Sequence, residues 1–156
     1  MAELKREDIE AKVAAGESLR GVDLSGAFLW EAKLCNARLQ SADMSEVKLV
    51  RADLRGAKLI RANLNQAVLC EADLRGADLF SANLNGSDLR AADLGAAYLS
   101  RAYLGGADMR DANLSNVDLS SAFLSGTNLR KAIYNSETRW PDGFDPEAAG
   151  TVFVSG

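Results

Sequence analysis

The sequence predicts an all-β solenoid, in which the chain coils repeatedly around a filled axis. A large apolar residue recurs at every fifth position from Leu19 to Leu129, and 21 of these 23 positions are Leu. Except in the degenerate first repeat, Glu17-Ser18-Leu19, the residue two positions earlier is small, usually Ala. Both prolines, Pro141 and Pro146, lie outside the repeat, as expected where every backbone N–H is needed for hydrogen bonds between coils.

A period of five fits neither regular element as a continuous run. On a straight α-helix, five residues turn the chain by about 500°, so successive leucines would step around it by about 140° and form no stripe. In a continuous strand, an odd period would send successive leucines to opposite faces. The leucines therefore share one interior only if the chain turns a corner in every repeat. The alternation of Leu with Ala then gives a core of large and small side chains that can pack densely.

The residue before the inward Leu is often Asp or Asn. Such runs are Ala52-Asp53-Leu54, Ala62-Asn63-Leu64, Ala82-Asn83-Leu84 and Ala112-Asn113-Leu114. They resemble the A(D/N)LXX motif of the pentapeptide-repeat proteins, whose stand-alone members are common in cyanobacteria. The resemblance covers residues 17–136 and implies a right-handed quadrilateral β-helix with four pentapeptides per coil. With 24 repeats, including one at Tyr134, that fold has about six coils.

Aligning the chain at the implied shift of twenty residues places like residues in columns. The columns are Asp53/Asp73/Asp93, Arg55/Arg75, Asn65/Asn85, Arg90/Arg110/Arg130 and Gly86/Gly106/Gly126. This agreement is consistent with the twenty-residue coil that the resemblance implies.

The N-terminal segment, residues 1–16, precedes the repeats and is predicted to be a helical cap. Good helix formers fill residues 4–15, and Gly16 is expected to end the helix. Its rough apolar face consists of Leu4, Ile9 and Val13. A β-helix exposes its core and its backbone at each end, so it needs a cover there. The alternative is a helix that binds a partner.

The repeat pattern ends at residue 136, and residues 137–156 form the third region. Turn-forming Pro and Gly alternate there with the large apolar Trp140 and Phe144, and residues 151–154 have strand-like propensity. We interpret this region as a C-terminal cap over the last coil. The alternative is a dimerisation surface, which gyrase-protecting relatives have at this end.

The residues needed for common enzyme chemistry are missing from the sequence. It contains no His, no Cys-x-x-Cys pair, no zinc-ligand spacing and no phosphate-binding loop. The many carboxylates follow the repeat, and Asp and Asn in turns bond nearby backbone, which explains why the two residues interchange. The sequence therefore predicts a non-enzymatic protein with no catalytic, cofactor or metal site and no small-molecule substrate.

Cellular location is predicted from apolar segments and cysteines. No stretch is long and apolar enough to cross a bilayer, and the charged N-terminal residues do not resemble a signal peptide. Cys35 and Cys70 fall on outward positions of different faces and coils, so they are not expected to pair. These features favour a cytoplasmic protein without a membrane partner.

The charge of the repeats bears on a second functional hypothesis. Some pentapeptide-repeat proteins resemble B-DNA in size and charge, and they inhibit gyrase or protect it and so confer quinolone resistance. In residues 17–136 the acidic and basic residues balance to zero, so the net charge of −4 comes from the two ends. A neutral surface imitates a polyanion poorly, and no uniformly basic face is present for direct binding of nucleic acid. We keep a gyrase-directed protein as the alternative function.

One face carries a candidate protein-interaction patch. At the twenty-residue shift, its N-terminal half presents Phe28, Trp30, Val50, Val68 and Cys70, whereas its C-terminal half presents alternating Arg and Asp. A second, smaller cluster on another face consists of Ile60, Phe80 and Tyr98. Contiguous exposed apolar patches usually mark interfaces, and Trp is enriched at binding hot spots. The first patch is predicted to bind a protein partner or a second copy; otherwise these are scattered exposed side chains, partly covered by the N-terminal helix.

Overall fold

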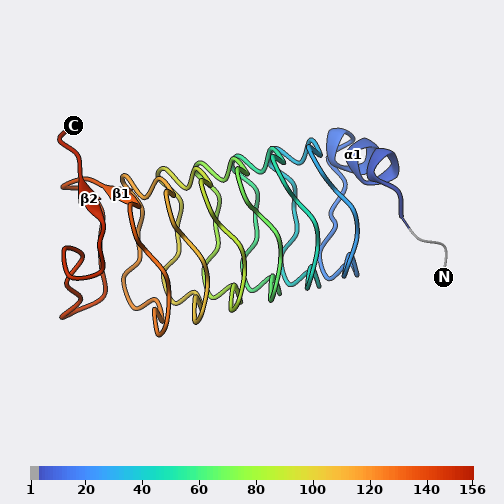
Figure 1. Ribbon diagram of the computed structural model, residues 1–156. Helices are drawn as coiled ribbons and strands as arrows, with labels where there is room; N and C mark the ends of the chain where they lie inside the picture. The colour runs from blue at the N-terminus through green and yellow to red at the C-terminus, as the bar shows by residue number, and fades with distance from the viewer. Residues whose placement is uncertain (1–3) are drawn as a thin grey trace.

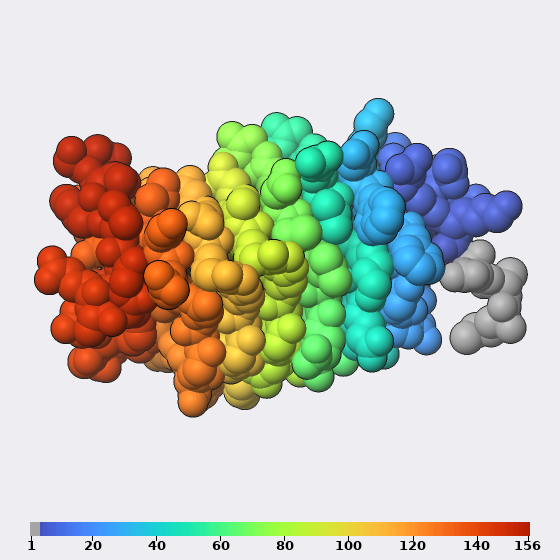
Figure 2. Space-filling view, in the orientation of Figure 1, coloured from blue at the N-terminus to red at the C-terminus, as the bar shows by residue number. Residues whose placement is uncertain are grey.

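The computed structural model describes residues 4–156, which form coils stacked in sequence order along one axis (Figures 1 and 2). Helix α1 (Arg6–Ala14) lies at one end of the stack. Strands β1 (Ile133–Tyr134) and β2 (Val152–Phe153) lie at the other end and pair in parallel.

The coils are joined in a fixed register. Parallel bridges connect residues twenty apart, from Ser18↔Arg38 to Asn113↔Ile133, so four pentapeptides complete one coil. This confirms the columns that the sequence alignment predicted. The period is lost at the C-terminal end, where Asp118 pairs with Arg139 and β1 pairs with β2.

The axis of the stack is filled by the repeated apolar side chains. Leu54, Leu74 and Leu94 are fully buried, as are nearly all their counterparts, and Leu124 near the C-terminal end is half-buried. The alanines two positions earlier are buried too. Ser87 occupies one of these positions, and its hydroxyl donates to the Leu84 carbonyl at 2.7 Å.

Tight turns separate the faces. In the turn from Leu49 to Ala52, the Ala52 N–H donates to the Leu49 carbonyl at 3.0 Å, and Arg51 has φ of 57°. A positive φ at the third residue is typical of type II turns. It recurs in every repeat from residue 21 to residue 131, mostly at non-glycine residues. Because only three residues are extended between successive turns, most faces contribute single bridges and no long strands.

The Asp or Asn of each motif completes the backbone hydrogen bonding. Within residues 52–56, every N–H except that of Arg55 donates to a backbone carbonyl. The Arg55 N–H donates instead to Asp53 Oδ1 at 3.2 Å, and the Asn65 N–H likewise donates to Asn63 Oδ1 at 3.1 Å. The prediction that these side chains bond nearby backbone, and so interchange, is confirmed.

The contribution of this hydrogen bond to stability can be tested at Asp78, whose Oδ1 accepts the Phe80 N–H at 3.1 Å. We expect Asp78→Ala to lower the free energy of unfolding by about 1 kcal/mol, since the donor loses its protein acceptor. Asp78→Asn retains an acceptor oxygen and should be close to neutral. Urea denaturation followed by circular dichroism measures both, and equal losses in the two variants would contradict this role.

The N-terminal helix is shorter than the predicted residues 4–15 and leaves Leu4 outside it, but all three predicted apolar residues contact the core. Ile9 is fully buried in the core, and Leu4 and Val13 pack partly buried against it. Gly16 ends the helix: its N–H donates to the Val13 carbonyl and its φ is +72°, a conformation that glycine adopts without strain.

The C-terminal region gathers its large apolar side chains at the end of the stack. Trp140 stacks on Phe144 with ring centroids 5.0 Å apart, and Tyr134 contacts Trp140 edge-on at 5.5 Å. The strand-like propensity of residues 151–154 is realised in β2. The capping roles of residues 1–16 and 137–156, and the alternative of a dimerisation surface, stay predictions.

Candidate interaction surface

The predicted patch residues lie on one face of the stack. Bridges join Phe28 to Lys48 and Lys48 to Val68, so these residues form one column. The other three patch residues, Trp30, Val50 and Cys70, each follow this column by two positions. Exposure is uneven: Phe28 is 70% and Trp30 57% exposed, whereas the remaining patch residues are half-buried.

The beginning of α1 borders the exposed end of this patch. An open groove of about 490 Å³ lies there, lined by Leu4, Lys5, Arg6, Glu7, Phe28 and Trp30. Arg6 Nη1 donates to the Trp30 carbonyl at 3.0 Å, and its Nε pairs with Glu10 at 3.1 Å. The helix therefore forms one wall of a groove and leaves both aromatic side chains exposed.

The C-terminal half of the same face carries the predicted ladder of Arg and Asp. Arg90 Nη2 lies 2.7 Å from Asp88 Oδ2, and Arg90 Nε lies 4.0 Å from Asp108 Oδ2 in the next coil. Arg110 in turn pairs with Asp108 at 2.6 Å. Both arginines thus neutralise the carboxylate of their own coil, and Arg90 also reaches toward that of the next.

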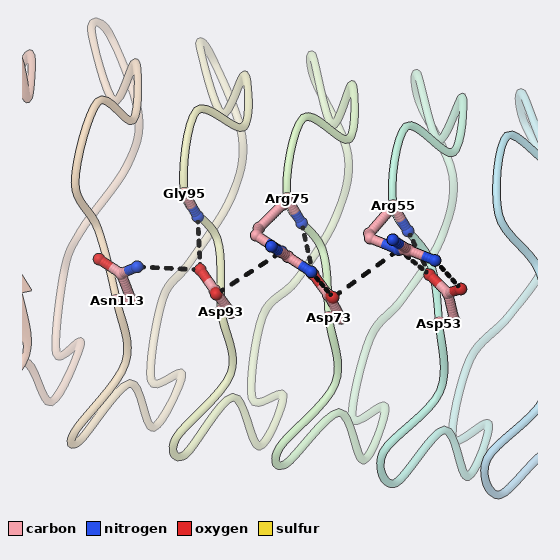
Figure 3. Close-up of polar contacts among 7 residues, drawn as sticks. All are labelled: Asp53, Arg55, Asp73, Arg75, Asp93, Gly95 and Asn113. Carbon is pink, nitrogen blue, oxygen red and sulfur yellow. Dashed lines mark hydrogen bonds and ion pairs between the residues drawn. The ribbon is translucent and has the colours of Figure 1, made fainter.

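Figure 3 shows a second ladder of the same kind on another face. Arg55 pairs with Asp53 at 2.8 Å and approaches Asp73 at 3.8 Å, and Arg75 repeats this one coil on. The column ends at Asn113, whose Nδ2 donates to Asp93 Oδ1 at 3.0 Å. On these two faces the charges are therefore paired locally, within repeats whose acidic and basic residues also balance in total.

These contacts lower carboxyl pKa values. For Asp53, Asp73, Asp88 and Asp108, the hydrogen bonds donated by the neighbouring arginine side chain lower the pKa below its usual range. Because the folded pKa lies below the unfolded one, this stabilisation is present above about pH 4 and is lost as the pH falls through the folded pKa values.

We therefore expect the melting temperature to be nearly constant from about pH 7 to pH 5 and to decrease below about pH 4. Circular dichroism at a series of pH values measures this dependence. Asp73→Asn keeps the backbone acceptor but removes one titrating carboxylate, so the decrease should be shallower in that variant. A melting temperature that rises on acidification would contradict the assignment.

Other exposed aromatic side chains form smaller groups. Of the second predicted cluster, Tyr98 is exposed and Ile60 and Phe80 are half-buried. Sequence reasoning missed a further pair, Tyr103 and Phe123, whose rings stack 4.9 Å apart in neighbouring coils. The twenty-residue alignment places these two residues in one column, so that signal could have revealed them.

Residues 4–156 contain no group of three or more His, Cys, Asp or Glu side chains that could hold a metal ion. Cys35 and Cys70 are free thiols, and burial raises the pKa of Cys70. In that same part of the chain, no helix has the length and apolar character needed to cross a membrane.

The fold and its surface define the class of this protein: a parallel β-solenoid with a twenty-residue coil and ladders of paired Arg and Asp on two faces. The family model for pentapeptide repeats matches residues 18–56, 57–95 and 97–133, with eight copies. The chain belongs to the pentapeptide-repeat family. The right-handed β-helix that the resemblance implied is the fold of this family, while the number of six coils stays a prediction.

One solved structure supports this assignment, and two others are reported only as similar chains. The chain is similar to alr5209, a pentapeptide repeat protein from Nostoc Pcc 7120, at 41% identity over 65% of this chain and 84% of that one, with a TM-score of 0.65. HetL, involved in heterocyst differentiation regulation in Nostoc sp. strain PCC 7120, is 28% identical over 96% and 92% of the two chains, with a TM-score of 0.22. QnrB1, a plasmid-mediated fluoroquinolone resistance protein, is 20% identical over 89% and 82%, with a TM-score of 0.38. No curated protein matches the chain.

Proposed function

We propose that this protein is a non-enzymatic interaction module, a stiff rod that binds another protein through the patch of Phe28, Trp30, Val50, Val68 and Cys70. The observation that carries the proposal is the exposure of Phe28 and Trp30 beside an open groove. Large aromatic side chains are costly to leave in water and are typical anchors of protein interfaces.

The Arg/Asp ladders support this assignment, because they are less suited than the aromatic patch to bind a partner. The Arg/Asp ladders satisfy their own charges, so those regions offer a partner little free electrostatic attraction. They also weigh against the gyrase-directed alternative, because paired carboxylates imitate the phosphates of DNA poorly. We further propose a cytoplasmic location, supported by the free thiols of Cys35 and Cys70.

The double variant Trp30→Ala, Val50→Ser tests the patch. Loss of a hot-spot residue typically costs 2 kcal/mol or more, so binding should weaken about thirtyfold or more. Sedimentation velocity measures self-association, and affinity capture with mass spectrometry measures partner binding. Tyr98→Ala is the matched control, because Tyr98 is 56% exposed but lies outside the patch.

The proposal is supported by a protein that is retained by the wild type and by Tyr98→Ala but lost by the double variant. It is contradicted if all three proteins behave alike while circular dichroism shows that each is folded. A supercoiling assay with purified gyrase distinguishes the alternative function, and we expect supercoiling to be unchanged in the presence of the protein.

A further inference from the structure

The ladder that continues the patch face is interrupted at its C-terminal end. Asp108 is bridged to Asn128 in the following coil, so an amide stands where Asp88 and Asp108 stand in the preceding coils. Asn128 Oδ1 still accepts the Arg130 N–H at 3.2 Å, so the turn is preserved. The carboxylate of the ladder is missing from this position, while the arginine that follows it remains.

This replacement leaves positive charge without its usual partner. Arg110 binds Asp108 at 2.6 Å but meets no carboxylate on its C-terminal side, unlike Arg90. Within residues 4–156, Arg130 and the neighbouring Lys131 take part in no ion pair shorter than 4.0 Å. The other ladder ends differently: its last residue, Asn113, donates a hydrogen bond to the carboxylate of Asp93.

A surface concavity lies at this break. It has a volume of about 170 Å³ and is lined by Arg110, Asp111, Arg130 and Lys131. Three cationic side chains and one carboxylate thus surround a space with room for a small anion. Guanidinium groups present planar sets of N–H donors that match the paired oxygens of phosphate and carboxylate groups.

We propose that this concavity binds an oxyanion, the phosphate or carboxylate group of a ligand, between Arg110 and Arg130. The bound group supplies, between the two arginines, the negative charge that the ladder lacks at Asn128, and Lys131 adds positive charge to the lining of the concavity. The site lies on the same face as the aromatic patch but in the last coils, and it does not depend on the function proposed above.

Titration of the ¹⁵N-labelled full chain with sodium phosphate tests this site, with sodium chloride at matched ionic strength as the reference. The backbone signals of Arg110, Arg130 and Lys131 and the Nε signals of the two arginines should shift and saturate with phosphate but not with chloride. Sodium acetate replaces phosphate in a parallel titration. Tighter binding of phosphate indicates a phosphorylated ligand, whereas equal or tighter binding of acetate indicates a carboxylate ligand.

Two variants make the test specific. Asn128→Asp restores the ladder, as in the preceding coil, so the saturable shifts should be lost. Asp111→Asn removes the carboxylate that lines the concavity and should strengthen phosphate binding; Asn also tolerates the positive φ of 61° at this position. Shifts that chloride reproduces, that do not saturate, or that persist unchanged in Asn128→Asp would overturn the proposal.

Discussion

Replacing Leu74 with alanine is expected to lower the free energy of unfolding by about 2–5 kcal/mol. Leu74 is fully buried in the middle of the stack, between Leu54 and Leu94 of the adjacent coils. The loss has two parts: the transfer free energy of the missing carbon atoms and the cost of the cavity that they leave. The cavity is expected to persist, because backbone hydrogen bonds hold neighbouring coils in register and limit their collapse around it.

The same substitution at Leu124 is the matched control. Leu124 occupies an equivalent inward position but is half-buried, so Leu124→Ala removes less apolar area from the core and should cost less. Urea denaturation followed by circular dichroism gives both values. Equal losses at the two positions would show that burial of the leucine column is not what stabilises the stack.

Enlarging a small inward residue is expected to have the second large effect on stability. Ala82 is fully buried, and its column neighbours Ala62 and Ala102 are fully buried too. Ala82→Leu adds three carbon atoms where the coils are closely stacked, so we expect a loss of about 1–3 kcal/mol or more. Thermal and urea denaturation measure the loss.

Ala82→Ser controls for the change of residue at this position. The structure already contains Ser87 at an equivalent inward site, where its hydroxyl donates to the carbonyl three residues earlier. A serine hydroxyl at residue 82 can donate to the Leu79 carbonyl in the same way, so the variant should lose less than about 1 kcal/mol of unfolding free energy. If serine and leucine were equally destabilising, crowding would not be the cause.

The sequence predicted the core and the register well because both follow from one strong periodicity. Every inward leucine is spaced by five residues, and no insertion disturbs the repeat from residue 17 to residue 136. The interchange of Asp and Asn was also predictable, because both side chains offer an oxygen to the same backbone N–H. The patch residues were placed on their shared face by the same columns.

Features that depend on side-chain neighbours were less predictable. The groove beside Trp30 could not be predicted, because it depends on where α1 lies. This helix is outside the repeat, so the five-residue period does not determine its position. The half-burial of Val50 and Val68 was not predicted, because the repeat assigns a residue to a face but does not set its exposed fraction. The positive φ at Arg51 and its counterparts was missed because glycine, the usual signal, occupies only some of these positions.

The twenty-residue register also constrains how this chain can change in length. Removing one whole coil would shorten the rod but leave every surviving side chain on its original face. Deleting a single pentapeptide, in contrast, would rotate everything beyond the deletion by a quarter turn about the long axis. The aromatic patch near residue 30 and the arginines near residue 130 would then point in different directions, so their alignment depends on the number of repeats between them.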